Sequence, residues 1–190
     1  DILFACSKMN KIGWYENLGG SWSAQKIITH NAKDVLDIEF SDIDQDGLSD
    51  ILFIGRDLGW YKNQGGGLFS SQILIDDQVS TIFWTNYDLH AKTFDLDNDG
   101  DLDIVTSTTL TNEYLSTYKN IGGGIFGAKN VIYNFGNSID PSGIDAADID
   151  NDGDLDIVSG EMNSIFWFEN NGAGDFTTSH TIDLYSGYTE

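Results

Sequence analysis

Basic residues are scarce in this chain of 190 residues. Nine Lys and Arg stand against 31 Asp and Glu, which gives a formal net charge of −22. Nucleic-acid binding requires clustered Lys and Arg that neutralise phosphates, so the charge balance argues against a nucleic-acid partner. An anionic membrane surface would also repel the chain, whereas cations complement its charge.

Long hydrophobic runs are missing as well. The longest are only a few residues, as at positions 51–54, whereas a membrane-spanning helix needs about 20 apolar residues. We therefore expect no direct membrane insertion. The chain also begins at Asp1 without an initiator Met or a leader-like segment, which predicts a processed chain or a fragment of a longer one.

Cysteine and proline each occur once, as Cys6 and Pro141. A single cysteine excludes an intramolecular disulfide, and its place after an apolar run predicts a buried, unreactive thiol. Glycine, by contrast, occurs 21 times, and hydrophobic residues make up 40% of the chain. This mixture favours a globular protein of short strands joined by tight turns.

A repeat dominates the rest of the sequence. Four segments begin alike, about 50 residues apart: DILFAC at Asp1, DILFIG at Asp50, DIVTST at Asp103 and DIVSGE at Asp156. Each copy continues with an apolar stretch that ends in an aromatic residue, a charged residue and Asn (WYEN, WYKN, TYKN, WFEN), followed by a glycine turn. An aromatic residue comes next, with an Ile six residues beyond it: Trp22 and Ile28, Phe69 and Ile75, Phe126 and Ile132, Phe176 and Ile182.

The apolar runs within each copy are short, rich in β-branched and aromatic residues, and bounded by Gly, Asn and Asp, which predicts strands. No window of ten or more residues carries a helical apolar stripe. One unit divides into four strands, near 36–40, 51–54, 59–62 and 71–75. Four-stranded units that repeat at this length are typical of propeller blades.

We therefore predict an all-β fold, a β-propeller built from four-stranded antiparallel blades. The whole chain would form a single propeller region. Its repeat units are expected at approximately 1–35, 36–88, 89–141 and 142–190.

Two neighbouring positions of the repeat carry an aromatic residue in nearly every copy. Adjacent strand residues point to opposite faces, so one row should pack between blades while the other could be exposed and stack on sugars. The two rows are Trp14, Trp60 and Trp167, and Tyr15, Tyr61, Tyr118 and Phe168.

An acidic nonapeptide precedes three of the four copies. It reads DIDQDGLSD at 42–50, DLDNDGDLD at 95–103 and DIDNDGDLD at 148–156, and the shared pattern is D-x-D-x-D-G-x-x-D. Side chains at positions 1, 3 and 5 of a tight loop can converge, Gly at position 6 permits the turn, and position 7 can offer its carbonyl. Oxygen ligands of this number and charge select a hard cation, most often Ca²⁺.

An EF-hand is excluded, because position 12 of the pattern is Phe53, Thr106 or Ser159 and never a carboxylate. A solvated acidic turn is the simpler alternative, but three copies with every acidic position kept argue against it. The carboxylates would repel one another without a cation, so metal binding should be coupled to folding. Loops of this kind suit extracellular Ca²⁺ concentrations, which predicts an extracellular or cell-surface location.

These features together resemble the FG-GAP/VCBS repeat family: the acidic loop, the W-Y-x-N strand, the glycine turn and the F-G-A at 126–128. That family builds seven-bladed propellers, including the integrin α-subunit head and a fungal fucose-binding lectin, and is common in bacterial surface and secreted proteins. The resemblance implies an arc of a seven-bladed propeller, with the remaining blades or other domains in a longer chain. A complete smaller ring is the alternative.

The resemblance also implies about three Ca²⁺ ions, one in each acidic loop. The side-chain ligands would be Asp42, Asp44, Asp46 and Asp50; Asp95, Asp97, Asp99 and Asp103; and Asp148, Asp150, Asp152 and Asp156. Backbone carbonyls would come from Leu48, Asp101 and Asp154.

The expected function is that of a non-enzymatic adhesion or recognition module that binds a protein or glycan ligand on a propeller face. The unusually long connection at 76–92 contains Phe83, Trp84 and Tyr87, which form either an interaction surface or an ordinary strand. Two alternatives are a carbohydrate-binding, lectin-like propeller and the accessory propeller of a larger secreted enzyme. The sequence carries no G-x-S-x-G, H-E-x-x-H or P-loop motif, so no catalytic residue is predicted.

Overall fold

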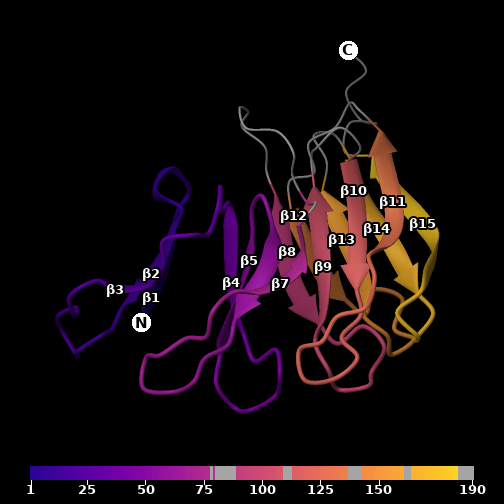
Figure 1. Ribbon diagram of the computed structural model, residues 1–190. Helices are drawn as coiled ribbons and strands as arrows, with labels where there is room; N and C mark the ends of the chain where they lie inside the picture. The colour runs from indigo at the N-terminus through magenta and orange to yellow at the C-terminus, as the bar shows by residue number, and fades with distance from the viewer. Residues whose placement is uncertain (78, 80–88, 109–112, 137–142, 161–163, 184–190) are drawn as a thin grey trace. The chain divides into compact units, whose positions relative to one another are not determined.

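The structure, a computed structural model, describes residues 1–77, 79, 89–108, 113–136, 143–160 and 164–183 (Figure 1). The possible surface formed by Phe83, Trp84 and Tyr87 therefore lies outside the described residues. The chain divides into two compact units, and we describe each by itself. The first comprises Asp1–Asp42 and Asp46–Phe83, and the second comprises Ile43–Gln45 and Trp84–Glu190.

The first unit contains two antiparallel sheets. One has three strands in the order β1-β2-β3, and the other has four in the order β4-β5-β6-β7. Their bounds are β1 Ile2–Cys6, β2 Lys11–Tyr15, β3 Lys26–Thr29, β4 Asp37–Ser41, β5 Asp50–Ile54, β6 Leu58–Tyr61 and β7 Ile73–Asp76. A short 3-10 turn, Ser7–Met9, joins the first two strands, and Cys6 at the end of β1 is half-buried rather than buried as expected.

The second unit contains two four-stranded antiparallel sheets, in the orders β8-β9-β10-β11 and β12-β13-β14-β15 (Figure 1). Their bounds are β8 His90–Phe94, β9 Asp103–Thr108, β10 Glu113–Tyr118, β11 Asn130–Gly136, β12 Gly143–Ala147, β13 Asp156–Gly160, β14 Ser164–Asn170 and β15 Phe176–Asp183. Strand β12 of the last sheet lies beside β8 and β9 of the preceding one.

The predicted all-β fold with four-stranded antiparallel propeller blades is confirmed. The strands expected near 36–40, 51–54, 59–62 and 71–75 correspond to β4, β5, β6 and β7, each shifted by one or two residues. The only helical element in the described part of the chain is the three-residue 3-10 turn, so no helix there is long enough to cross a membrane. The organisation of 1–190 as a single region of four repeat units, and the seven-bladed parent, stay predictions.

The inner strands of each sheet are more buried than its edge strands. All five residues of β5 and all six of β9 are buried, whereas two of the four residues of the edge strand β7 are exposed. A strand covered on both faces is expected to be apolar throughout, which explains the continuous run at 51–54. The buried Asp that begins β5, β9 and β13 is an exception to this pattern, and so are the buried Thr106, Ser107 and Thr108 of β9.

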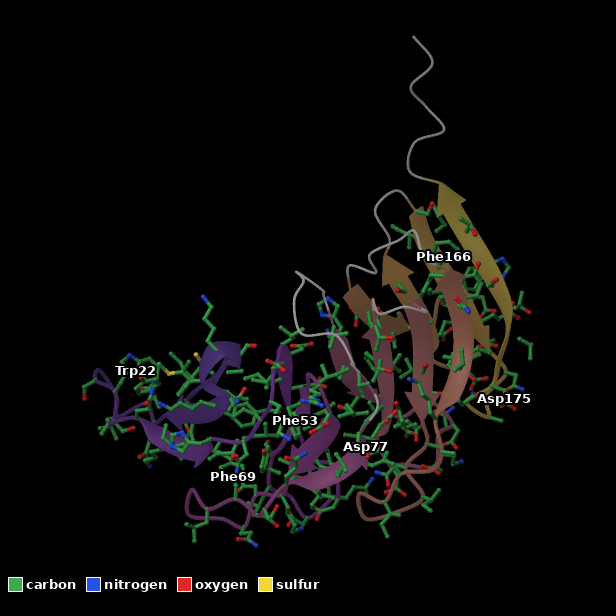
Figure 2. The ribbon with its side chains drawn as sticks, turned by 45° about the horizontal axis from the view of Figure 1, so that its top comes forward. Trp22, Phe53, Phe69, Asp77, Phe166 and Asp175 are labelled. Atoms are coloured by element: carbon green, nitrogen blue, oxygen red, sulfur yellow. The ribbon has the colours of Figure 1, made fainter. Side chains whose placement is uncertain are left out.

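Each unit has a hydrophobic core, and the two cores share some equivalent repeat positions, such as Ile51 with Ile157 and Tyr61 with Phe168. In the first unit Ile51, Phe53 and Tyr61 pack with Ile12 and Val35, and Figure 2 shows Phe53 and Phe69 among the side chains of this unit. The core of the second unit contains residues from six strands, β9 to β14, and one residue of an acidic loop. Its buried members are Leu96, Val105, Leu115, Phe135, Ile144, Ile157 and Phe168.

The two aromatic rows behave differently from each other. Three of the four members of one row, Tyr61, Tyr118 and Phe168, are at most 2% exposed, whereas the fourth, Tyr15, is half-buried. The other row is not freely exposed as the sequence allowed, because Trp60 is buried and Trp14 and Trp167 are half-buried. This row therefore does not present a continuous line of exposed Trp rings on which sugars could stack.

Two glycines mark places where neighbouring strands come very close. A Cβ added to Gly13 would lie 2.6 Å from the carbonyl oxygen of Lys26, and one added to Gly59 would lie 2.6 Å from that of Ile73. Both glycines lie at a register shift between the second-last and last strands of their sheets. These positions, one residue before Trp14 and Trp60, therefore exclude any larger residue.

Candidate metal sites

Each acidic nonapeptide joins the first strand of a four-stranded sheet to the second. Residues 42–50 connect β4 to β5, residues 95–103 connect β8 to β9, and residues 148–156 connect β12 to β13. The last Asp of every loop is also the first residue of the following strand. This is the strand–loop–strand setting that the sequence predicts.

The three loops share one backbone conformation. Position 4 is left-handed in each of them, with φ of 59° at Gln45, 57° at Asn98 and 63° at Asn151. Position 6 is left-handed too, with Gly at φ values of 86°, 92° and 102°. The invariant Gly is explained by this second left-handed turn, which a side chain would strain.

Two hydrogen bonds recur inside all three loops. The N–H of the Gly at position 6 donates to the Asp at position 1, over 3.0 Å to Asp42, 3.2 Å to Asp95 and 3.2 Å to Asp148. The N–H of position 7 donates to the Asp at position 5, over 2.9–3.0 Å. These two hydrogen bonds thus orient the carboxylates at positions 1 and 5 within the loop.

The structure brings predicted ligands together in every loop. Within each cluster one carboxylate oxygen per residue lies within 4.8 Å of the others. The clusters are Asp42, Asp44 and Asp50; Asp95, Asp97 and Asp99; and Asp148, Asp150 and Asp152. Positions 1 and 3 are therefore gathered in all three loops, position 5 in the second and third, and position 9 in the first alone.

The donor set of these clusters fits a hard cation. The gathered atoms are carboxylate oxygens, which accept but cannot donate hydrogen bonds when ionised. One oxygen of Asp95, Oδ1, is buried and accepts no hydrogen bond from any described group. A buried, unsatisfied carboxylate oxygen is costly on its own and is the expected state of a ligand before its ion arrives.

The last Asp of each loop is held as a buried hydrogen-bond acceptor. Asp103 is 3% exposed and Asp156 is fully buried. Asp156 accepts from the N–H of Asn170 at 2.9 Å and from the N–H of Ile149 at 3.1 Å. In this structure these two carboxylates thus tie the loop to its own sheet and lie outside the clusters.

Burial raises the pKa of Asp103 to about 6. Hydrogen bonds from Asn120 and Leu96 lower the pKa, and the negative charges of Asp97 and Asp99 raise it further. A cation beside this loop would offset the burial and repulsion and keep the carboxyl ionised.

The residues predicted to supply position-7 carbonyls lie at the rim of each loop. Leu48 is partly exposed, and its N–H donates to Asp46. The side chain of Asp154 accepts a 3.0 Å hydrogen bond from Nδ2 of Asn98, a residue of the preceding loop. Asp101 donates its N–H to Asp99.

The Asn of the W-Y-x-N motif is a structural residue to which the sequence analysis gave no role. In all four copies its N–H donates to the Asp that opens the DIL or DIV segment, which is Asp1, Asp50, Asp103 or Asp156, and its Oδ1 accepts from the Gly two residues on. Its side-chain amide donates to the carbonyl of position 8 of the acidic loop, from Asn63 to Ser49 and from Asn170 to Leu155. The recurrence of Asn in four copies was the signal that could have revealed this role.

The charged residue before this Asn also reaches the acidic loop in two copies. Lys62 Nζ lies 2.7 Å from Asp46 Oδ2. Lys119 forms an ion pair with Asp97 and lies 3.5 Å from Asp99 Oδ2. The equivalent residue of the last copy, Glu169, has the opposite charge.

Comparison with known proteins identifies the repeat. Residues 42–106 and 95–159 match the FG-GAP-like repeat, so the matched segments contain all three acidic loops. Among curated proteins, no sequence is similar enough to match.

Among solved structures, this chain is similar to a lectin of Agrocybe aegerita, whose structure is described as the basis of specific recognition of non-reducing terminal N-acetylglucosamine. The TM-score is 0.65 at 20% sequence identity, and the match covers 93% of this chain and 47% of the lectin. At this identity the likeness shows the fold alone. The chain spans about half the length of that lectin.

Proposed function

The chain belongs to the FG-GAP-like repeat family, and on this premise we propose that it is a calcium-stabilised recognition module that works outside the cell or on its surface. The observation that carries the proposal is the threefold recurrence of one loop conformation with a gathered carboxylate cluster. The proposed role of this segment is to bind a ligand, without catalysis.

Ca²⁺ is the cation that these loops fit best. It accepts six to eight oxygen ligands in flexible geometry, whereas Mg²⁺ demands a small octahedral site and keeps several waters. Loops with four or five Asp supply carboxylate and carbonyl oxygens in excess of what Mg²⁺ requires. Extracellular modules bind Ca²⁺ with dissociation constants of roughly 10⁻⁴–10⁻³ M, which is why we place the protein outside the cell.

A thermal melt tests the calcium proposal. We expect the melting temperature in 10 mM CaCl₂ to exceed that in EDTA by several degrees, because an ion that binds only the folded chain at about 100 times its dissociation constant stabilises it by about 2.7 kcal/mol. MgCl₂ at the same concentration should give a smaller shift. Identical melts in CaCl₂ and EDTA would remove both the calcium proposal and the argument for location.

A hollow on the first unit favours a glycan as the ligand. It has a volume of about 570 Å³ and is lined by the aromatic side chains of Trp14, Phe40 and Phe69, by Asn63 and by the glycine turn at 65–67. Apolar rings beside polar groups and backbone amides are the surface that sugars stack on and hydrogen-bond to. The lectin with a similar fold supports this choice.

A glycan array probed with the calcium-loaded chain tests this second candidate. We expect binding that is lost in Phe40→Ala, since Phe40 is 44% exposed and its removal should leave the fold intact. Leu74→Ala, at an exposed position of β7 outside the hollow, is the matched control. An array without hits in Ca²⁺ would exclude the glycan and leave a protein ligand as the partner.

A further inference from the structure

One position of the repeat changes charge from copy to copy, and it lies beside the acidic loops. This is the residue between the aromatic residue and the Asn that anchors each loop: Lys62, Lys119 and Glu169. The two lysines at this place contact carboxylates in the loop of their own sheet. A charge at this position is therefore close enough to act on the affinity of the loop for a cation.

In the first acidic loop the ammonium group of Lys62 forms an ion pair with a predicted calcium ligand, Asp46. Its Nζ lies 2.7 Å from Asp46 Oδ2, and this contact and the N–H of Leu48 hold the pKa of Asp46 below its usual value. Asp46 is also the position-5 carboxylate that is missing from the gathered cluster, where Asp50 takes its place. The lysine thus draws one predicted ligand away from the centre.

In the second loop Lys119 contacts two members of the cluster. It forms an ion pair with Asp97, whose side chain is 5% exposed, and lies 3.5 Å from Asp99. The pKa of Lys119 is raised, chiefly by its hydrogen bond to Asp97. A cation that binds this loop has to displace or share the contacts of the ammonium group.

In the third loop the equivalent residue repels where the lysines attract. Glu169 Oε2 lies 3.3 Å from His180 Nε2, on the neighbouring strand β15. Burial raises the pKa of Asp150, and the negative charges of Asp152, Asp156 and Glu169 add to the rise. The carboxylates of this loop therefore have no lysine of their own hairpin to neutralise them.

The formal charges rank the three loops from least to most negative. The loops contain four, five and five Asp, so with Lys62, Lys119 and Glu169 included the sums are −3, −4 and −6. We propose that this one position tunes the three calcium sites, with Lys62 and Lys119 acting as internal counter-ions that the metal must displace and Glu169 making 148–156 the tightest site. The inference rests on the calcium binding proposed above.

The experiment is a Ca²⁺ titration followed by NMR at the backbone amides of Gly47, Gly100 and Gly153. Each of these amides donates to the first Asp of its own loop, so each reports one site. In the wild type we expect Gly153 to respond at the lowest Ca²⁺ concentration and Gly47 at the highest.

Two charge variants test the cause of the order. Lys119→Gln should move the Gly100 midpoint to about two- to fivefold lower Ca²⁺, and Glu169→Gln should move the Gly153 midpoint to higher Ca²⁺ by a similar factor, the range for one exposed charge contact. Both shifts should shrink in high salt. Lys8→Gln, a surface lysine outside the loops, should leave all three midpoints in place.

The outcomes separate this inference from the proposal beneath it. If no glycine amide responds to Ca²⁺, the calcium proposal itself is wrong. If all three respond but the Gly100 midpoint stays fixed in Lys119→Gln, the calcium sites stand and the tuning by this position is refuted. Lys62→Gln repeats the test on the loop 42–50, where the Gly47 midpoint should move to lower Ca²⁺.

Discussion

The side-chain amide of Asn170 donates a 2.7 Å hydrogen bond to the carbonyl oxygen of Leu96, a residue 74 positions earlier in the chain. Leu96 is position 2 of the acidic loop of the preceding sheet, and Asn170 follows the aromatic pair of the last sheet. Asn120 makes the equivalent bond to Ile43, over 3.1 Å. Within the second unit, the side chain of Asn170 therefore anchors the hairpin turn of its own sheet and holds the loop of the sheet before it.

Asn170→Ala should destabilise the protein by about 2–4 kcal/mol. The substitution removes donors to Leu96 and Leu155 and leaves those buried carbonyls without this partner, which costs more than the loss of exposed hydrogen bonds. Urea unfolding followed by circular dichroism measures the change. Asn130→Ala, at an exposed position of β11, should stay within about 0.5 kcal/mol of the wild type. Equal losses in the two variants would contradict the anchoring role.

Gly59→Ala should cost far more than Gly127→Ala. A Cβ at position 59 would lie 2.6 Å from the carbonyl of Ile73, so the two strands must move apart, at a cost of about 1–3 kcal/mol. At Gly127 the nearest atom is the carbonyl of Lys119 at 3.6 Å, an ordinary contact. Thermal melts of the two variants should therefore diverge. A Gly59→Ala protein as stable as Gly127→Ala would show that the strands are not this close.

Asp97→Ala should weaken calcium binding by roughly tenfold or more at its own loop, because even residues that only support a metal ligand cost 10–100-fold when removed. The stabilisation gained on adding CaCl₂ should fall, while melting in EDTA should change little. Asp77→Ala removes the same charge from an exposed position outside the loops, visible in Figure 2, and should keep the full calcium response. A matching loss in both variants would mean that total charge, and not ligation, governs the response.

The stability of the protein should fall as the pH rises above about 10, in part because of Tyr61. Burial raises the pKa of this phenol, so the folded chain keeps its proton after the unfolded chain has lost its own. The free energy of unfolding then declines with pH, by up to about 1.4 kcal/mol per pH unit from this group. Tyr61→Phe should flatten the decline above pH 10, as measured by urea unfolding at a series of pH values. An unaltered slope in Tyr61→Phe would show that the pKa of this phenol is the same in the folded and the unfolded chain.

Local sequence determined the strands, the turns and the acidic loops of this protein. Strand alternation, glycine turns and the D-x-D-x-D-G-x-x-D pattern act over fewer than ten residues, so the run at 51–54 and the convergence of Asp95, Asp97 and Asp99 could be predicted without any long-range contact. The repetition of these patterns, together with the family that they resemble, then gave the propeller blades.

Only the tertiary structure decided which side chains from other parts of the chain contact the acidic loops. The burial of Asp103 and Asp156 is set by the packing around each loop. The ion pairs of Lys62 and Lys119 and the bond from Asn170 to Leu96 join residues that lie about 16 to 74 positions apart. Such contacts depend on the register of hairpins and on how sheets pack within a unit, which no local pattern specifies. The sequence thus determines where a cation would bind, and the packing decides which neighbouring charges compete for it.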